Sequence, residues 1–99
     1  MLKHIVLLKA RAGSADQIEG IFRELAALVG AIPGLRDFSG GLNNSPEGKA
    51  QGFTHGFVMS FDGAASRDSY VPHPDHRRVA SKLGGMVEDV LVFDFDGPS

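Results

Sequence analysis

The sequence predicts a ferredoxin-like α+β fold, in which helices cover one face of a four-stranded antiparallel sheet. Three observations predict it. The 99 residues are enough for one domain, residues 1–99, and not for two. Apolar residues make up 42% of the chain and charged residues 22%, which is typical of a globular protein. Strand-like and helix-like segments follow in the order β-α-β-β-α-β, which is the split β-α-β arrangement.

Each segment is predicted from the spacing of its apolar residues and from the turn formers that bound it. Strand-like segments are short and β-branched or alternating, whereas helix-like segments repeat their apolar residues every three or four positions. Pro72 and Pro74 divide the second helical region in two, so the order of elements is kept. The predicted strands are 2–9, 35–42, 53–61 and 87–95, and the predicted helices are 14–32, 64–70 and 75–83.

The first helix is the most strongly marked element. Ser14 and Gln17 have the spacing of a capping box, in which each side chain accepts a hydrogen bond from the other residue's backbone N–H. Apolar residues then follow at helical spacing as far as Ile32. Pro33 and Gly34 are expected to end the helix, because proline disfavours helical geometry in the residue before it.

Two of the strands are apolar on both faces, which predicts a homodimer through the open sheet face. Two helical regions cover only one face of the sheet, so a monomer would leave the other exposed. A second copy packed on it about a two-fold axis would bury on the order of 800 Å² per partner. A monomer with a mildly apolar face is the alternative. The opposed sets are Ile5 and Leu7 against Val6 and Leu8, and Val87, Leu91, Phe93 and Phe95 against Val90 and Val92.

Composition excludes several classes of partner and site. Ten Lys and Arg against twelve Asp and Glu give a net charge of -2, which offers no broad basic surface for nucleic acid. Cysteine is absent, which excludes disulfides and thiolate metal sites and fits a cytoplasmic location. The longest aliphatic run near the start is 5–8, too short for a signal peptide or a membrane span.

The four histidines and the single tyrosine are the candidates for chemistry. Histidine is chosen because its charge changes near neutral pH. Two histidines lie inside strands that are neighbours in a ferredoxin-like sheet, beside large apolar residues such as Phe57. The other candidates cluster around the break between the last two helices. If both strand histidines face the helices, all five converge between the sheet and the helices. The candidates are His4, His55, Tyr70, His73 and His76.

A structural role is the alternative for each candidate. A strand histidine among apolar neighbours is more often hydrogen-bonded in the core than catalytic. His73 precedes a proline and is a candidate for shaping a turn. His73 and His76 have an i,i+3 spacing, but without cysteine and with few carboxylates nearby a metal site is the minority hypothesis. The carboxylates near the end of the chain, Asp94 among them, are expected to be strand-edge charges that prevent aggregation.

Five stretches together resemble a known family. The most specific of them contain Tyr-x-x-His-Pro-x-His and a Thr-His pair that follows an aromatic residue. With these motifs the chain is similar to the stress-responsive A/B-barrel domain family, often abbreviated Dabb, over nearly its whole length. This resemblance implies a dimeric α+β barrel. The stretches are 4–7, 32–35, 52–57, 70–76 and 88–95.

The resemblance extends to the olivetolic acid cyclase-like polyketide cyclases of that family, which close a linear poly-β-keto thioester by aldol condensation with no metal or organic cofactor. Aldol closure needs a base to remove a proton flanked by two carbonyls and a donor to stabilise the enolate; imidazole and phenol suit these roles. The resemblance implies that Tyr70 and His76 are catalytic. The predicted substrate-binding residues are His4 and His55, which match pocket histidines, and His73 and Phe57 beside them.

The expected function is therefore binding of a small organic ligand between sheet and helices, with a cofactor-independent lyase or cyclase as the enzyme hypothesis. A non-catalytic stress-response or assembly module is the alternative, and a cofactor-free monooxygenase of similar architecture is a weaker one. An enzyme needs an open, partly apolar cavity reached by Tyr70 and His76. In a module these side chains are expected to be packed and fully hydrogen-bonded.

Overall fold

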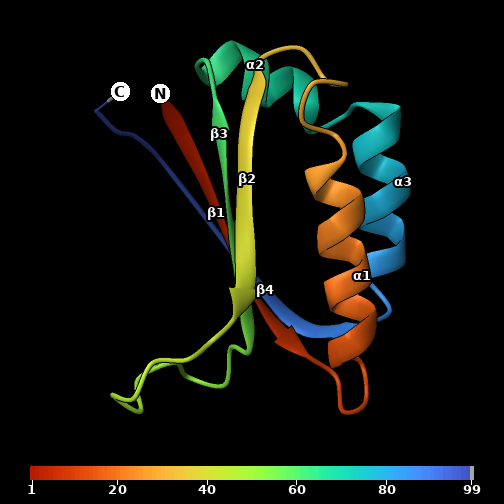
Figure 1. The fold of residues 1–99 in the computed structure, drawn as a ribbon, viewed down its shortest axis with the longest axis vertical. Coiled ribbons are helices and arrows are strands. Elements are labelled where there is room, and N and C mark those ends of the chain that lie inside the picture. The colour runs from red at the N-terminus through yellow and green to blue at the C-terminus, as the bar shows by residue number, and fades with distance from the viewer. Residues whose placement is uncertain (99) are drawn as a thin grey trace.

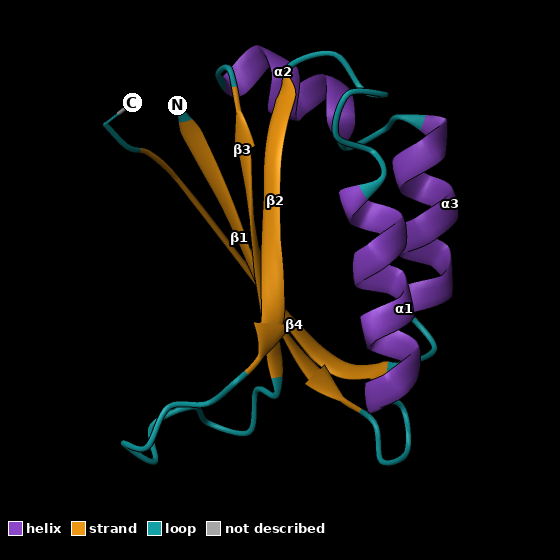
Figure 2. Ribbon diagram, viewed as in Figure 1, coloured by secondary structure: helices purple, strands orange, loops and turns teal. Residues whose placement is uncertain are grey.

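The computed structural model describes residues 1–98 and confirms the ferredoxin-like fold. One antiparallel sheet has the strand order β2-β3-β1-β4, and the helices lie against one of its faces (Figure 1). Figure 2 shows that the opposite face carries no helix. Within residues 1–98, no helix is long and apolar enough to span a membrane. The elements are β1 (Leu2–Ala10), α1 (Ala15–Ala26), β2 (Leu35–Leu42), β3 (His55–Phe61), α2 (Ala64–Tyr70), α3 (Pro74–Leu83) and β4 (Val87–Asp96).

The core lies between the two central strands and the helices. Alternation along β1 turns every second side chain toward the helices, and those side chains are buried. Antiparallel pairing places His4 opposite Met59 and Val6 opposite Phe57, so β3 adds large side chains to the same face. His4 therefore sits in the helix-covered face of a central strand, surrounded by apolar groups.

Helix α1 is shorter than the predicted helix, because it ends at Ala26 and not at Ile32. The backbone N–H of Leu28 donates to the carbonyl of Leu25, a tighter turn than that of an α-helix. Gly30 then takes a positive φ of 86°, which a continuing helix does not allow. Leu28 and Ile32 are nevertheless buried, so the apolar spacing predicted their burial and not their conformation.

The capping-box prediction is wrong. Ser14 precedes α1, but its side chain makes no capping hydrogen bond. Its backbone N–H is already used, since it donates to the carbonyl of Arg11 at 3.0 Å. Ser14 also has near-helical dihedral angles, φ -99° and ψ -1°, in place of the extended geometry that a capping side chain needs.

An irregularity in β4 changes the face of one predicted side chain. Lys9 pairs with Asp89, whereas Ala10 pairs with Val87, so β4 contains one extra residue at this point. The bulge turns Val87 toward the helices, where it is buried. The prediction that Val87 shares a face with Leu91 is therefore wrong.

Candidate functional site

A cavity of about 400 Å³ lies between the helix-covered face of the sheet and helices α1 and α3. This volume is within the range of small-molecule sites. Most of the wall is apolar, and Phe57 forms part of it. Three polar side chains, those of His4, Tyr70 and His76, also line the cavity. The apolar side chains of the wall include Val6, Ile21, Leu25, Val79, Leu83, Val87, Val90 and Val92.

Tyr70 and His76 meet because the chain breaks between α2 and α3. Tyr70 is the last residue of α2, His76 is in the first turn of α3, and their ring centroids are 4.1 Å apart. Nδ1 of His76 lies 2.9 Å from the carbonyl oxygen of Val71. Since a carbonyl only accepts, the neutral ring carries its proton on Nδ1 and leaves an unprotonated Nε2. Burial lowers the pKa of His76, which favours this neutral form.

The hydroxyl of Tyr70 stays protonated and is a hydrogen-bond donor, whereas Nε2 of His76 is an acceptor. Its side chain is almost completely buried, and burial raises the pKa of its hydroxyl far above the ordinary value. Within residues 1–98 its hydroxyl forms no hydrogen bond. Tyr70 therefore offers the cavity a protonated hydroxyl that is free to donate.

His4 is held by a hydrogen-bond chain that crosses three elements. Its Nδ1 lies 2.8 Å from one oxygen of Asp94 on β4, and the other oxygen accepts from Arg67 of α2 at 2.9 Å. Asp94 lies on an edge strand, as expected, but the β1–β4 register places it opposite His4 on the helix side, where its carboxylate binds His4 and Arg67 and is not an exposed charge. Side chains alternate between faces along a strand, so Val90, Val92 and Asp94 share one face. This alternation was the sequence signal that could have placed Asp94 on the helix side.

The expected convergence of all five candidates is only partly observed. His55 faces the helices, as expected, but it pairs with Leu8 and lies four positions along the sheet from the Met59–His4 pair. Four residues of strand span about 13 Å, which places His55 beyond the cavity. Its Nδ1 is 2.8 Å from the Thr54 hydroxyl, and its buried Nε2 has no partner within residues 1–98.

His73 lies outside the cavity lining as well, and its ring has a structural role. It is the N-terminal capping residue of α3, and its Nδ1 accepts a hydrogen bond from the backbone N–H of Asp75 at 3.1 Å. This agrees with the turn-shaping alternative. Nowhere in the described chain do three or more histidine, cysteine or acidic side chains gather as a metal site.

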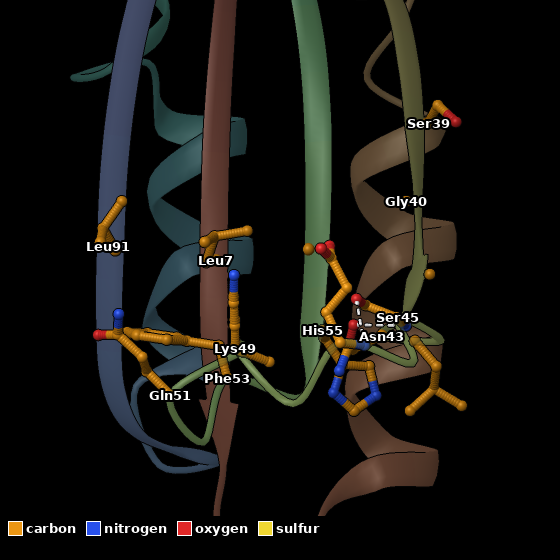
Figure 3. A pocket seen from close by; sticks show the side chains of 15 residues that line it. Leu7, Ser39, Gly40, Asn43, Ser45, Lys49, Gln51, Phe53, His55 and Leu91 are labelled. Atoms are coloured by element: carbon orange, nitrogen blue, oxygen red, sulfur yellow. Dashed lines mark hydrogen bonds between the residues drawn. The ribbon is translucent and has the colours of Figure 1, made fainter.

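A second hollow, of about 630 Å³, lies at the other side of the sheet, near the loop that joins β2 and β3. Figure 3 shows Leu7 and Leu91 on neighbouring strands of this wall, with Lys49 and Gln51 reaching from the loop. His55 is the only one of the five candidates in its wall. Although it is larger, this hollow lacks the Tyr70–His76 pair.

Curated relatives resemble the chain over almost its full length. It is 33% identical to the stress-response A/B barrel domain-containing protein HS1 of Arabidopsis thaliana, over 95% of this chain and 87% of that protein. It is 27% identical to olivetolic acid cyclase of Cannabis sativa, over 95% of this chain and 94% of the cyclase.

Solved structures agree with the fold. A dimeric ferredoxin-like protein from Jannaschia sp. CCS1 superposes with a TM-score of 0.88 and 31% identity, covering 97% of this chain and 98% of that one. A hydroxynitrile lyase from Passiflora edulis has a TM-score of 0.84 at 24% identity, over 95% and 90% of the two chains. An antibiotic biosynthesis monooxygenase has a TM-score of 0.79 at 18% identity, with both chains fully covered. These last two show the fold alone.

The family profile of the stress responsive A/B barrel domain, Dabb, matches residues 2–96. That range contains every strand and helix described above and all of the cavity lining. The chain therefore belongs to the stress-responsive A/B barrel domain family.

Proposed function

We propose that this chain binds a small organic molecule in the 400 Å³ cavity and acts on it as a cofactor-independent lyase or cyclase for a β-keto, polyketide-like substrate. One observation carries the proposal. An unprotonated Nε2 of His76 and a protonated hydroxyl of Tyr70 meet in an otherwise apolar cavity. The polyketide cyclase among the relatives supports the choice of substrate class.

The proposed chemistry is an aldol closure. Nε2 of His76 removes a proton from a carbon flanked by two carbonyls, which gives an enolate and an imidazolium ion. The Tyr70 hydroxyl donates a hydrogen bond to the enolate oxygen. The enolate carbon attacks a second carbonyl of the same molecule and forms the new C–C bond. The resulting alkoxide takes the proton back from the imidazolium, so the protein ends in its starting state.

The surroundings of the pair suit this chemistry. Apolar walls exclude water, so hydrogen bonds to a developing charge are stronger than in solution. Phe57 and His4 border the same cavity and are proposed to bind the substrate. The substrate-binding roles of His55 and His73 stay predictions, since neither lines the cavity.

The geometry favours this proposal over a non-catalytic module. A module calls for packed and satisfied side chains at Tyr70 and His76, whereas both reach a cavity. Within residues 1–98 neither the Tyr70 hydroxyl nor Nε2 of His76 has a hydrogen-bond partner. The monooxygenase alternative has only the shared fold in its favour, so we do not propose it.

The test starts from a fragment screen by protein-observed NMR, followed by turnover of linear tri- and tetra-β-keto thioesters. His76→Ala is expected to lower turnover by roughly 10²- to 10⁴-fold, the usual contribution of a general base. Tyr70→Phe is expected to lower it by at least 10-fold, because one donor to the enolate is lost. Full affinity and full turnover in both variants would end the proposal.

Arg77→Ala is the matched control for these variants. It truncates an exposed side chain next to His76 in the same helix, α3, and outside the cavity lining. The control is expected to retain wild-type turnover, so a loss in His76→Ala then reports the cavity and not the folding of α3.

The partner we propose is a second copy bound through the open sheet face. Structural neighbours from Jannaschia sp. CCS1 and Thermobifida fusca are described as dimeric, at 31% and 26% identity. The cytoplasmic location stays a prediction.

A further inference from the structure

We infer that Asp94, together with Arg67, is a positioning residue of the cavity: it keeps the ring proton of His4 on Nδ1 and leaves Nε2 of His4 as a second acceptor for the ligand. The use of that acceptor rests on the proposed function. The position of the proton does not, and it can be measured without any ligand.

The first step is the contact between His4 and Asp94. The two residues are paired across β1 and β4, and Nδ1 lies 2.8 Å from the carboxylate. Their side chains are 11% and 18% exposed, so water competes little for this hydrogen bond. A carboxylate accepts and does not donate. The neutral ring of His4 therefore carries its proton on Nδ1.

The second step is the role of Arg67. Its guanidinium donates to the other oxygen of Asp94 at 2.9 Å and to Asp68 at 2.9 Å. A guanidinium has donors only, so whatever stands at position 94 must turn an acceptor toward Arg67. Arg67 thereby decides which atom of residue 94 faces His4.

The third step is what this does to the cavity. Nε2 of His4 forms no hydrogen bond within residues 1–98. The His4 ring is 6.1 Å from Tyr70 between centroids, and Tyr70 stacks on His76. The cavity thus presents two unprotonated ring nitrogens and one hydroxyl.

Among residues 1–98, no Lys, Arg, Asp or Glu lines the cavity. A carboxylate ligand would find no full positive charge to offset its desolvation. The ligand class that fits is a neutral apolar molecule with hydroxyl, enol or acidic C–H donors. Through Asp94, His4 is set to accept from one of those donors while His76 accepts from another.

The first test is the tautomer of His4, read from the ring ¹⁵N resonances of the free protein. In Asp94→Asn, Arg67 holds the amide oxygen, so the amide NH₂ turns to His4 and the ring proton moves to Nε2. In the double variant Asp94→Asn with Arg67→Met the amide is free to present either its oxygen or its NH₂ to His4, so both ring tautomers are expected. Asp96→Asn, an exposed residue two positions along β4, is the control and keeps the wild-type tautomer.

The second test is binding preference, measured with 4-propylphenol, which donates, and butyrophenone, which only accepts. Asp94→Asn is expected to lower the phenol-to-ketone affinity ratio by roughly tenfold, because one hydrogen bond is lost and one gained. A general loosening of the fold lowers both affinities and leaves the ratio unchanged.

Each result decides a separate point. Retention of the proton on Nδ1 in Asp94→Asn overturns the inference, whatever the ligands do. Exclusive retention of the proton on Nε2 in the double variant overturns the role of Arg67. A shifted tautomer with an unchanged affinity ratio overturns the use of His4 as an acceptor. Failure of both probes to bind the wild type counts against the proposed function and leaves the tautomer result standing.

Discussion

Among single residues, His76 carries the pH dependence that we expect of this protein. Its pKa is lowered from 6.5, first by burial, so the unfolded chain binds more protons than the folded one between the folded pKa and 6.5. The stabilisation from this group is therefore complete above pH 6.5 and is lost as the pH falls through the folded pKa. An NMR titration of the His76 ring is expected to give a midpoint below 6.5, and a midpoint at or above 6.5 contradicts this.

The sequence predicted which residues could do chemistry better than it predicted which residues they contact. Tyr70 and His76 each lie two positions from the nearer proline of the break, so their proximity followed from local sequence. Asp94 and Arg67 are 27 residues apart, and their contact depends on how α2 crosses the end of the sheet. Alternation assigns a side chain to a face, but it does not say which helix residue meets it there.

Between elements, Gly34 is the position that tolerates a side chain least. It joins the end of the α1 region to β2 with a φ of +82°, and an added Cβ would lie 2.5 Å from Cβ of Ser66 in α2. Gly13 has the same φ but open space around it, so Gly13→Ala measures the backbone strain alone. We expect Gly13→Ala to cost about 1 kcal/mol and Gly34→Ala to cost roughly 1–3 kcal/mol more in urea unfolding. Equal losses would mean that α2 moves away freely.

The elements also show where periodicity stops being informative. Leu28 and Ile32 continue the apolar stripe of α1 and are buried, yet the chain there forms tight turns around Gly30. Burial is set by which side faces the core, and both a helix and a turn satisfy it. Helix length depends on the left-handed Gly30, and the proline three residues further on obscured this signal.

For the whole molecule, the order of segments was sufficient to predict the sheet and the helix-covered face. Few chain topologies connect six elements of this length without crossings. The cavity could not be predicted in this way, because its volume depends on how far α1 and α3 stand off the sheet near β4. That distance is set by packing of many side chains and not by any single motif.

The uncovered face of the sheet has the composition of an interface. Phe93 is 60% exposed, and Phe95, Leu91 and Val58 are exposed around it. The register places Ile5 opposite Phe93 and Leu7 opposite Leu91, so these apolar groups form one continuous patch. A patch of this kind on a small protein marks a contact with another molecule. Because the patch can meet its own copy about a two-fold axis, a homodimer is the simplest way to cover it.

Two adjacent residues of β4 offer a matched test of this dimer. Phe93 and Val92 are 60% and 58% exposed, but they point to opposite faces of the sheet. Light scattering coupled to size exclusion is expected to give a dimer for the wild type at micromolar concentration. Phe93→Asp is expected to give a monomer, because it places a charge at the centre of the apolar interface. Val92→Asp adds the same charge on the helix side and is expected to stay dimeric. A monomeric wild type, or a Val92→Asp variant that dissociates while Phe93→Asp does not, would place the interface elsewhere.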